Sequence, residues 1–109
     1  MRYYVVMNKN SWERYFDGEN WLELFINAEG DKSYYLNNRV HRRDGPAVER
    51  ANGEKYYIVD GYLHREDGPA IEIFDGSESY YLFGDLYDSL PSPEKIEIIK
   101  KEKLIKSIL

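Results

Sequence analysis

Two histidines each begin a seven-residue motif that could carry chemistry. The motif reads HRRDGPA at 41–47 and HREDGPA at 64–70, and the copies lie 23 residues apart in a chain of 109. A histidine near a carboxylate can serve as a general base or as a metal ligand. In such chemistry the aspartates would orient the histidines within each copy: Asp44 with His41, and Asp67 with His64.

The surroundings of the motif argue against that chemistry. Neither copy has a serine or cysteine nearby to act as a nucleophile, and the whole chain has no cysteine. If one repeat spans two strands of a sheet, the histidines lie ~10 Å apart, which is too far for both to bind one ion. We therefore expect no catalytic residue, no metal site and no cofactor.

A joint between repeating units explains more of the motif. In a joint, the aspartates accept hydrogen bonds from backbone N–H groups, and the glycine adopts an unusual φ before a proline that starts a strand. Histidine can bond a backbone group across the connection, and arginine can lie over a neighbouring tyrosine. The candidate turn or ligand residues are His41, Arg42, Asp44, His64, Arg65 and Asp67.

The elements that must position the motif follow from the same 23-residue period. Glycines recur at 30, 53 and 76, and tyrosines recur at 34, 57 and 80. Residues 1–88 are thus interpreted as one repeat sheet. It contains a degenerate unit at 14–36, full units at 37–59 and 60–82, and a partial unit at 83–88.

Each unit predicts a β-hairpin. Asn52-Gly53 and Asp75-Gly76 predict tight type I′ turns, and the strands that follow are aromatic and β-branched. A second turn precedes each motif and recurs at 83–84. We expect a mainly β fold, an elongated antiparallel sheet of tandem hairpins. The stretch 1–10 is expected to be a first strand, because its apolar run is too short for a signal peptide or a membrane span.

The segment GYLHREDGPA at 61–70 and its copy at 38–47 resemble a variant of the MORN repeat. The shared features are the 23-residue length, the glycine-punctuated hairpins and the HRxDGPA block, and they cover about residues 14–88. Similar variants occur in proteins of bacteriophages, giant viruses and bacteria, including an antitoxin family. The resemblance implies a sheet used for contacts, without a shared catalytic mechanism. The first unit departs from the pattern because it lacks HRxDGP.

Residues 92–109 predict an amphipathic helix that caps the sheet. Ser92 can cap its N-terminus, Pro93 suits its first position, and Glu94 complements the helix dipole. The expected apolar stripe is Ile98, Ile105 and Leu109 with Ile99 beside it, and the expected solvent side is Lys100, Lys103 and Lys106. The alternatives are a dimerisation helix or a segment that inserts into a partner. Glutamates among the lysines disfavour binding to a membrane surface.

Adjacent tyrosines at 34–35, 56–57 and 80–81 must point to opposite faces of a strand. The period groups Tyr34, Tyr57 and Tyr80 in one stripe, and the pattern leaves open which stripe is exposed. One helix is too little to cover a sheet of eight or more strands, so one face must stay largely open, and exposed aromatic residues are typical binding hot spots. The candidate partner-binding residues are Tyr34, Tyr57, Tyr80, Tyr35, Tyr81 and Tyr62.

The charge is uneven, at −7 over residues 1–88 and +2 over 89–109, for a total of −5. An acidic body disfavours nucleic acid and favours a protein partner with a basic surface. The leading hypothesis is a small non-enzymatic binding protein of the cytoplasm, for example a phage-type inhibitor of a host enzyme or defence complex in the host cytoplasm. The alternative is a homo-oligomer that sequesters a nucleotide-like small molecule between aromatic faces and arginines such as Arg42 and Arg65.

Overall fold

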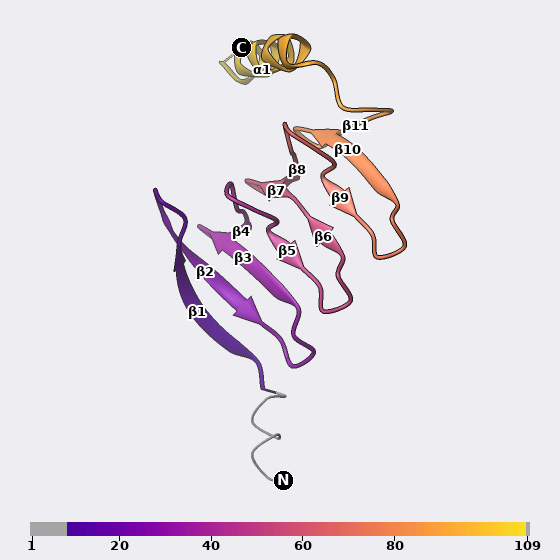
Figure 1. Ribbon diagram of the computed structural model, residues 1–109. Coiled ribbons are helices and arrows are strands. Elements are labelled where there is room, and N and C mark those ends of the chain that lie inside the picture. The colour runs from indigo at the N-terminus through magenta and orange to yellow at the C-terminus, as the bar shows by residue number, and fades with distance from the viewer. Residues whose placement is uncertain (1–8, 109) are drawn as a thin grey trace.

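The fold is an elongated antiparallel sheet with one helix at its C-terminal end (Figure 1). The structure is a computed structural model that describes residues 9–108, and these residues form eleven strands and one helix. Nine strands form one sheet in the order β1-β2-β3-β5-β6-β9-β10-β11 with β4 paired to β3, and β7 pairs with β8. The dimensions are 56 × 32 × 21 Å. The predicted fold class is confirmed, while the strand expected near the N-terminus falls mainly on residues 1–8, outside the described residues.

Most strands are short. The elements are β1 (Ser11–Phe16), β2 (Trp21–Ile26), β3 (Lys32–Leu36), β4 (Arg39–Val40), β5 (Val48–Glu49), β6 (Lys55–Tyr56), β7 (Ile58–Val59), β8 (Tyr62–Leu63), β9 (Ile71–Glu72), β10 (Glu78–Leu82), β11 (Asp85–Tyr87) and α1 (Pro93–Ile108). The turns at 27–31, 50–54 and 73–77 follow one another along one side of the sheet, where the strands end (Figure 1).

The type I′ turns lie where the second turn of each unit was expected. A type I′ turn needs positive φ at both central residues. Asn37 and Asn38 have φ values of 52° and 66°. The corresponding values at 60–61 are 52° and 84°, and at 83–84 they are 53° and 85°. The 23-residue period is therefore visible in the backbone itself.

The hairpin tips at Asn52-Gly53 and Asp75-Gly76 are a different turn, so the type I′ prediction there is wrong. Only the glycine has positive φ, 97° at Gly53 and 93° at Gly76. The N–H of Gly53 donates to the Arg50 carbonyl, and the N–H of Arg50 donates to the Glu54 carbonyl. This is the longer hairpin connection in which a type I turn is followed by one left-handed residue. One glycine is sufficient for it, and Asn52 keeps ordinary φ.

The two faces of the sheet are buried to different extents. Residues that face one another across antiparallel strands share a face, and neighbours along a strand alternate. One face, here called the covered face, contains the buried residues Leu22, Leu24, Tyr34, Ala47, Ala70 and Leu82. On the opposite face, here called the aromatic face, none of the described strand residues is buried. The connections 39–47 and 60–70 lie over the covered face, because Arg42 and Arg65 stack on its tyrosines.

The core consists of two small clusters at opposite ends of the sheet. Leu22, Leu24 and Tyr34 form the N-terminal cluster. Leu82 packs with two residues of the helix, Ile96 and Ile99, in the C-terminal cluster. Between the clusters the strands are two residues long, and the buried side chains are His41 and the alanines that end the two motifs.

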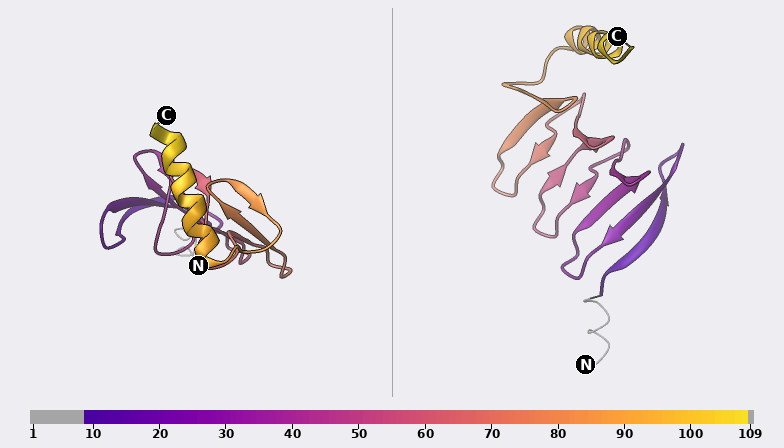
Figure 2. Two further views of the ribbon diagram at one scale, coloured as in Figure 1. Left: turned by 90° about the horizontal axis from the view of Figure 1, so that it is seen from above. Right: turned by 180° about the vertical axis from the view of Figure 1, so that it is seen from behind.

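The helix lies across the end of the sheet beyond β10 and β11, and its N-terminus is capped as predicted (Figure 2). The hydroxyl oxygen of Ser92 accepts a hydrogen bond from the N–H of Lys95 at 3.2 Å. No helix among the described residues is long and apolar enough to cross a membrane.

The predicted orientation of this helix is wrong. Ile96 and Ile99 face the sheet, whereas Ile98 and Ile105 are about half exposed, at 51% and 54%. Two lysines assigned to the solvent side instead reach carboxylates of the sheet: Lys100 binds Glu66 at 3.4 Å, and Lys103 binds Asp85 at 2.8 Å. Lys100 and Lys103 therefore lie on the side of the helix that faces the sheet end. Leu109, the third residue of the expected stripe, lies outside the described residues.

Candidate functional site

The two HRxDGPA motifs, at 41–47 and 64–70, form structurally equivalent joints, here called the first and second joint. Nδ1 of His41 accepts a hydrogen bond from the N–H of Asp60 at 3.0 Å, and Nδ1 of His64 accepts one from the N–H of Phe83 at 3.0 Å. Asp60 and Phe83 are the first residues of the two following type I′ turns. Each histidine thus holds the turn of the next unit, across the connection as expected.

The tautomer of His41 follows from these contacts. Its Nδ1 also lies 3.2 Å from Oδ1 of Asp60, but a nitrogen that accepts the backbone N–H cannot donate to that oxygen. The proton of the neutral ring is therefore on Nε2, which is buried and has no hydrogen-bond partner among the described residues. In the second joint the equivalent Nε2 of His64 lies 2.9 Å from Glu66.

The arginines of the joints stack on tyrosines as predicted, and each guanidinium lies close to the glycine of its motif. The guanidinium carbon of Arg42 lies 4.3 Å from the ring centre of Tyr34, and that of Arg65 lies 3.9 Å from Tyr57. A Cβ added at Gly45 or Gly68 would come within 2.9 Å or 2.8 Å of the guanidinium carbon. Neither glycine is among the residues with positive φ. The prediction of an unusual φ is wrong here, and a side chain at either position would instead force the stacked arginine to shift.

The aspartates bind side chains where backbone N–H donors were expected. Asp44 accepts from Arg42 Nε at 2.8 Å and from the Tyr15 hydroxyl, and Asp67 accepts from Arg65 Nε at 3.0 Å. Partial burial opposes ionisation of Asp44, but the hydrogen bonds from Tyr15 and Arg42 outweigh it, so its pKa lies below the ordinary value. The two aspartates thus orient the arginines, and a backbone N–H group of the next turn bonds each histidine.

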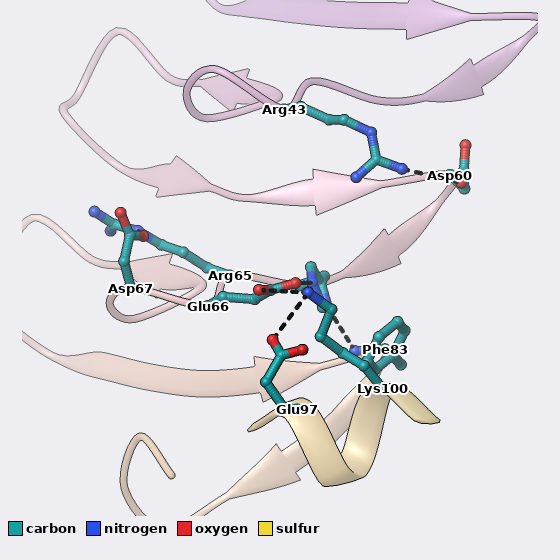
Figure 3. A network of polar contacts seen from close by, with 9 residues as sticks. Arg43, Asp60, Arg65, Glu66, Asp67, Phe83, Glu97 and Lys100 are labelled. Carbon is teal, nitrogen blue, oxygen red and sulfur yellow. Dashed lines mark hydrogen bonds and ion pairs between the residues drawn. The ribbon is translucent and has the colours of Figure 1, made fainter. Parts of the chain in front are cut away.

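Glu66 links the second joint to the helix (Figure 3). Its carboxylate bonds His64 at 2.9 Å and Lys100 at 3.4 Å, and Lys100 also lies 3.3 Å from Glu97. Burial opposes ionisation of Glu66, but the contacts with His64 and Lys100 prevail and lower its pKa. In the first joint this position is Arg43, which lies 3.9 Å from Asp60.

A groove of about 590 Å³ lies between the two joints on the covered face. It is lined by Arg42, Arg43, Asp44, Gly45, Tyr57, Val59, His64, Arg65, Glu66 and Asp67. Three arginines and three carboxylates balance in charge, so the groove does not present the excess positive charge that a nucleotide phosphate requires. Four hydrogen bonds already engage the Arg42 guanidinium. His41 does not line this groove, and no serine does.

The described residues contain no group of three or more histidine, cysteine, aspartate or glutamate side chains that could hold a metal ion. The histidines and aspartates of the joints make the contacts within the chain described above.

The aromatic face carries most of the exposed large apolar side chains of the described strands. Its strand residues include Trp12, Phe16, Trp21, Phe25, Tyr35, Tyr56, Tyr81 and Leu86. Trp12 lies 4.8 Å from Phe25 and 5.9 Å from Tyr35, ring centre to ring centre. Trp12 is 62% exposed and Leu86 is 65% exposed. Its charged strand residues are Arg14 and Glu23, which stand opposite each other, so this face is nearly neutral.

The six candidate tyrosines are divided between different surroundings. Tyr34, Tyr57 and Tyr80 share the covered face: Tyr34 is buried, Tyr57 lies under Arg65, and Tyr80 is half-buried. Tyr35 and Tyr81 belong to the aromatic face. Tyr62, 60% exposed, lines a second groove of about 450 Å³ near the helix.

Sequence reasoning missed the tryptophans and phenylalanines of β1 and β2. Trp12, Arg14 and Phe16 alternate with polar residues and Tyr15, and Trp21, Glu23 and Phe25 alternate with Leu22, Leu24 and Ile26. This period of two places the tryptophans opposite the leucine face, and it is the signal that identifies them. The 23-residue period does not show this alternation, because the first unit is degenerate.

Comparisons with family models, with curated proteins and with solved structures find no match to this chain. The resemblance to MORN-type repeats therefore rests on the repeated motif and its spacing.

Proposed function

We propose that this chain is a small non-enzymatic protein-binding module that docks onto a partner protein through its aromatic face. The supporting observation is a broad sheet face that carries the exposed Trp12, Phe16 and Trp21 beside partly buried tyrosines, with no buried strand residue among those described. Tryptophan and tyrosine dominate binding energy in protein interfaces because they bury large areas at low entropic cost.

The charge distribution supports a particular type of partner. The strand residues of the aromatic face are nearly neutral, while residues 1–88 as a whole carry a net charge of −7. An apolar patch on the partner, bordered by basic residues, would complement both features. The resemblance to MORN-type proteins of phages favours a host enzyme or defence complex as this partner, which would place the encounter in the host cytoplasm.

The test is capture of the partner from a bacterial lysate by the full chain, followed by mass spectrometry. The Trp12→Ala/Tyr35→Ala double variant is expected to reduce capture at least about tenfold, because each aromatic hot spot contributes on the order of 1–2 kcal/mol. The matched control is Phe74→Ala. Phe74 is an exposed aromatic residue in the turn between β9 and β10, outside the strands that form this face.

Capture that is equal for the double variant and the wild type would overturn the proposal. So would a lysate from which no protein is captured while heat denaturation releases a small molecule, a result that would favour sequestration instead.

A further inference from the structure

The first joint already binds a tyrosine side chain. The Tyr15 hydroxyl donates to Asp44 Oδ2 and accepts from Arg42 Nη2 at 3.2 Å. Its ring lies edge-on to Tyr34, with ring centres 5.2 Å apart, and 4.9 Å from the guanidinium carbon of Arg42. The arginine–aspartate pair of a joint, with the tyrosine beneath it, is therefore a phenol-binding arrangement.

The second joint presents the same groups. Arg65 lies over Tyr57 and donates to Asp67, as Arg42 does to Tyr34 and Asp44. No described residue forms a hydrogen bond with Arg65 Nη2 or Asp67 Oδ2, the two atoms that correspond to the partners of Tyr15. The Asp67 side chain is 86% exposed, against 37% for Asp44. The difference arises because the sheet contains no second tyrosine equivalent to Tyr15.

The groove between the joints lies where such a tyrosine would sit. Tyr15 approaches the first joint from the N-terminal side of the sheet, and the 590 Å³ groove flanks the second joint on that same side. This volume is at the scale of small-molecule pockets and can accept a phenol ring. Its balanced charges suit an uncharged hydroxyl that both donates and accepts a hydrogen bond.

We propose that the second joint binds a tyrosine side chain of a partner protein in the way that the first joint binds Tyr15. Tyr57 would lie against the ring, Asp67 would accept the hydroxyl hydrogen bond, and Arg65 Nη2 would donate to the phenol oxygen. The occupant is a peptide tyrosine because the first joint binds one carried by a strand. The site lies on the face opposite the aromatic face, so it does not depend on the function proposed above.

The test is an NMR titration of the full chain with N-acetyl-L-tyrosine amide, a minimal form of a partner's tyrosine. We expect saturable shifts of the Arg65 Nε–H and Gly68 amide signals, and no change in the indole signals of Trp12 and Trp21 on the opposite face. N-acetyl-L-phenylalanine amide is expected to bind at least about tenfold more weakly, because both charge-assisted hydrogen bonds of the hydroxyl are lost.

Asp67→Ala should weaken binding of the tyrosine amide about tenfold, and the high exposure of Asp67 makes this variant safe for folding. Glu78→Ala is the control, because it removes one exposed carboxylate of the same face and should leave binding unchanged. Equal binding of the tyrosine and phenylalanine amides would overturn the proposal. Tyrosine-amide binding that Asp67→Ala does not weaken, or the lack of any saturable shift at Arg65, would also overturn it.

Discussion

At the residue scale, the joint histidines support backbone conformations that other residues avoid. Asp60 and Phe83 have φ values of 52° and 53°, a region that is costly for side chains larger than glycine. Each donates its N–H to a histidine Nδ1, and the ring of Phe83 also lies 4.4 Å from that of His64. The histidine therefore compensates for the strained first residue of the next turn.

Substitution of His41 tests this role. His41→Ala removes the acceptor for the Asp60 N–H and leaves a cavity at a site that is 2% exposed, so we expect the free energy of unfolding to fall by about 2–3 kcal/mol. Urea denaturation followed by circular dichroism measures the change. Arg43→Ala is the control, because its contact with Asp60 is long and exposed and should contribute under about 0.5 kcal/mol. Equal effects of the two substitutions would contradict the assigned role.

At the element scale, the helix orientation depends on pairs of side chains across the sheet end. A helical wheel places Ile98 and Ile99 100° apart, and the sequence pattern allows either to face the sheet. Burial of Ile96 and Ile99 against Leu82 stabilises the docked side, and the lysine contacts with Glu66 and Asp85 lie on that same side.

The two neighbouring isoleucines provide a matched pair of variants. Ile99→Ala should lower the free energy of unfolding by about 2–4 kcal/mol and speed hydrogen exchange of the helix amides, because it opens a cavity against Leu82. Ile98→Ala should change it by less than about 0.5 kcal/mol, because the side chain is half exposed. The reverse order of effects would show that the helix docks on its other side.

At the scale of the whole molecule, carboxylates distributed along the sheet make the fold sensitive to acid. Hydrogen bonds from backbone N–H groups are the main cause of the lowered pKa of Asp17, Asp31 and Asp75 in the hairpin turns. Asp44 and Glu66 have lowered pKa values although partial burial opposes their ionisation. A carboxyl with a lower pKa in the folded state binds protons less readily there than in the unfolded chain.

We therefore expect stability to fall on acidification. The contribution is fully present above the ordinary pKa values of 3.8 for aspartate and 4.5 for glutamate, and it is lost as the pH falls through the lowered values of the folded state. Urea midpoints measured from pH 7 down to about pH 2 check this. Asp44→Asn should flatten the acid slope, and a slope equal to that of the wild type would contradict the role of the Tyr15–Asp44–Arg42 contacts.

The repeat sheet could be predicted because its cause is local. Turn residues, alternating strands and a helix cap each depend on residues that are close together in the sequence. The sequence therefore predicts the turns from the glycines at 30, 53 and 76, and it predicts the start of the helix from Ser92 and Pro93. The stacking of Arg42 and Arg65 on tyrosines could also be predicted, because each arginine follows its tyrosine closely along the chain, across the boundary between two units.

The tertiary structure decided what depends on contacts between distant segments. The exposed stripe, the side of the helix that packs and the pairing of Tyr15 with Asp44, 29 residues apart, each follow from which surfaces meet. Both faces of a β-strand carry similar side chains here, so local propensity cannot distinguish them. The physical reason is that the burial of a side chain depends on the segment that packs against it as well as on its own type. The 109-residue sequence therefore determines the repeat units, and the packing of these units determines which residues are exposed.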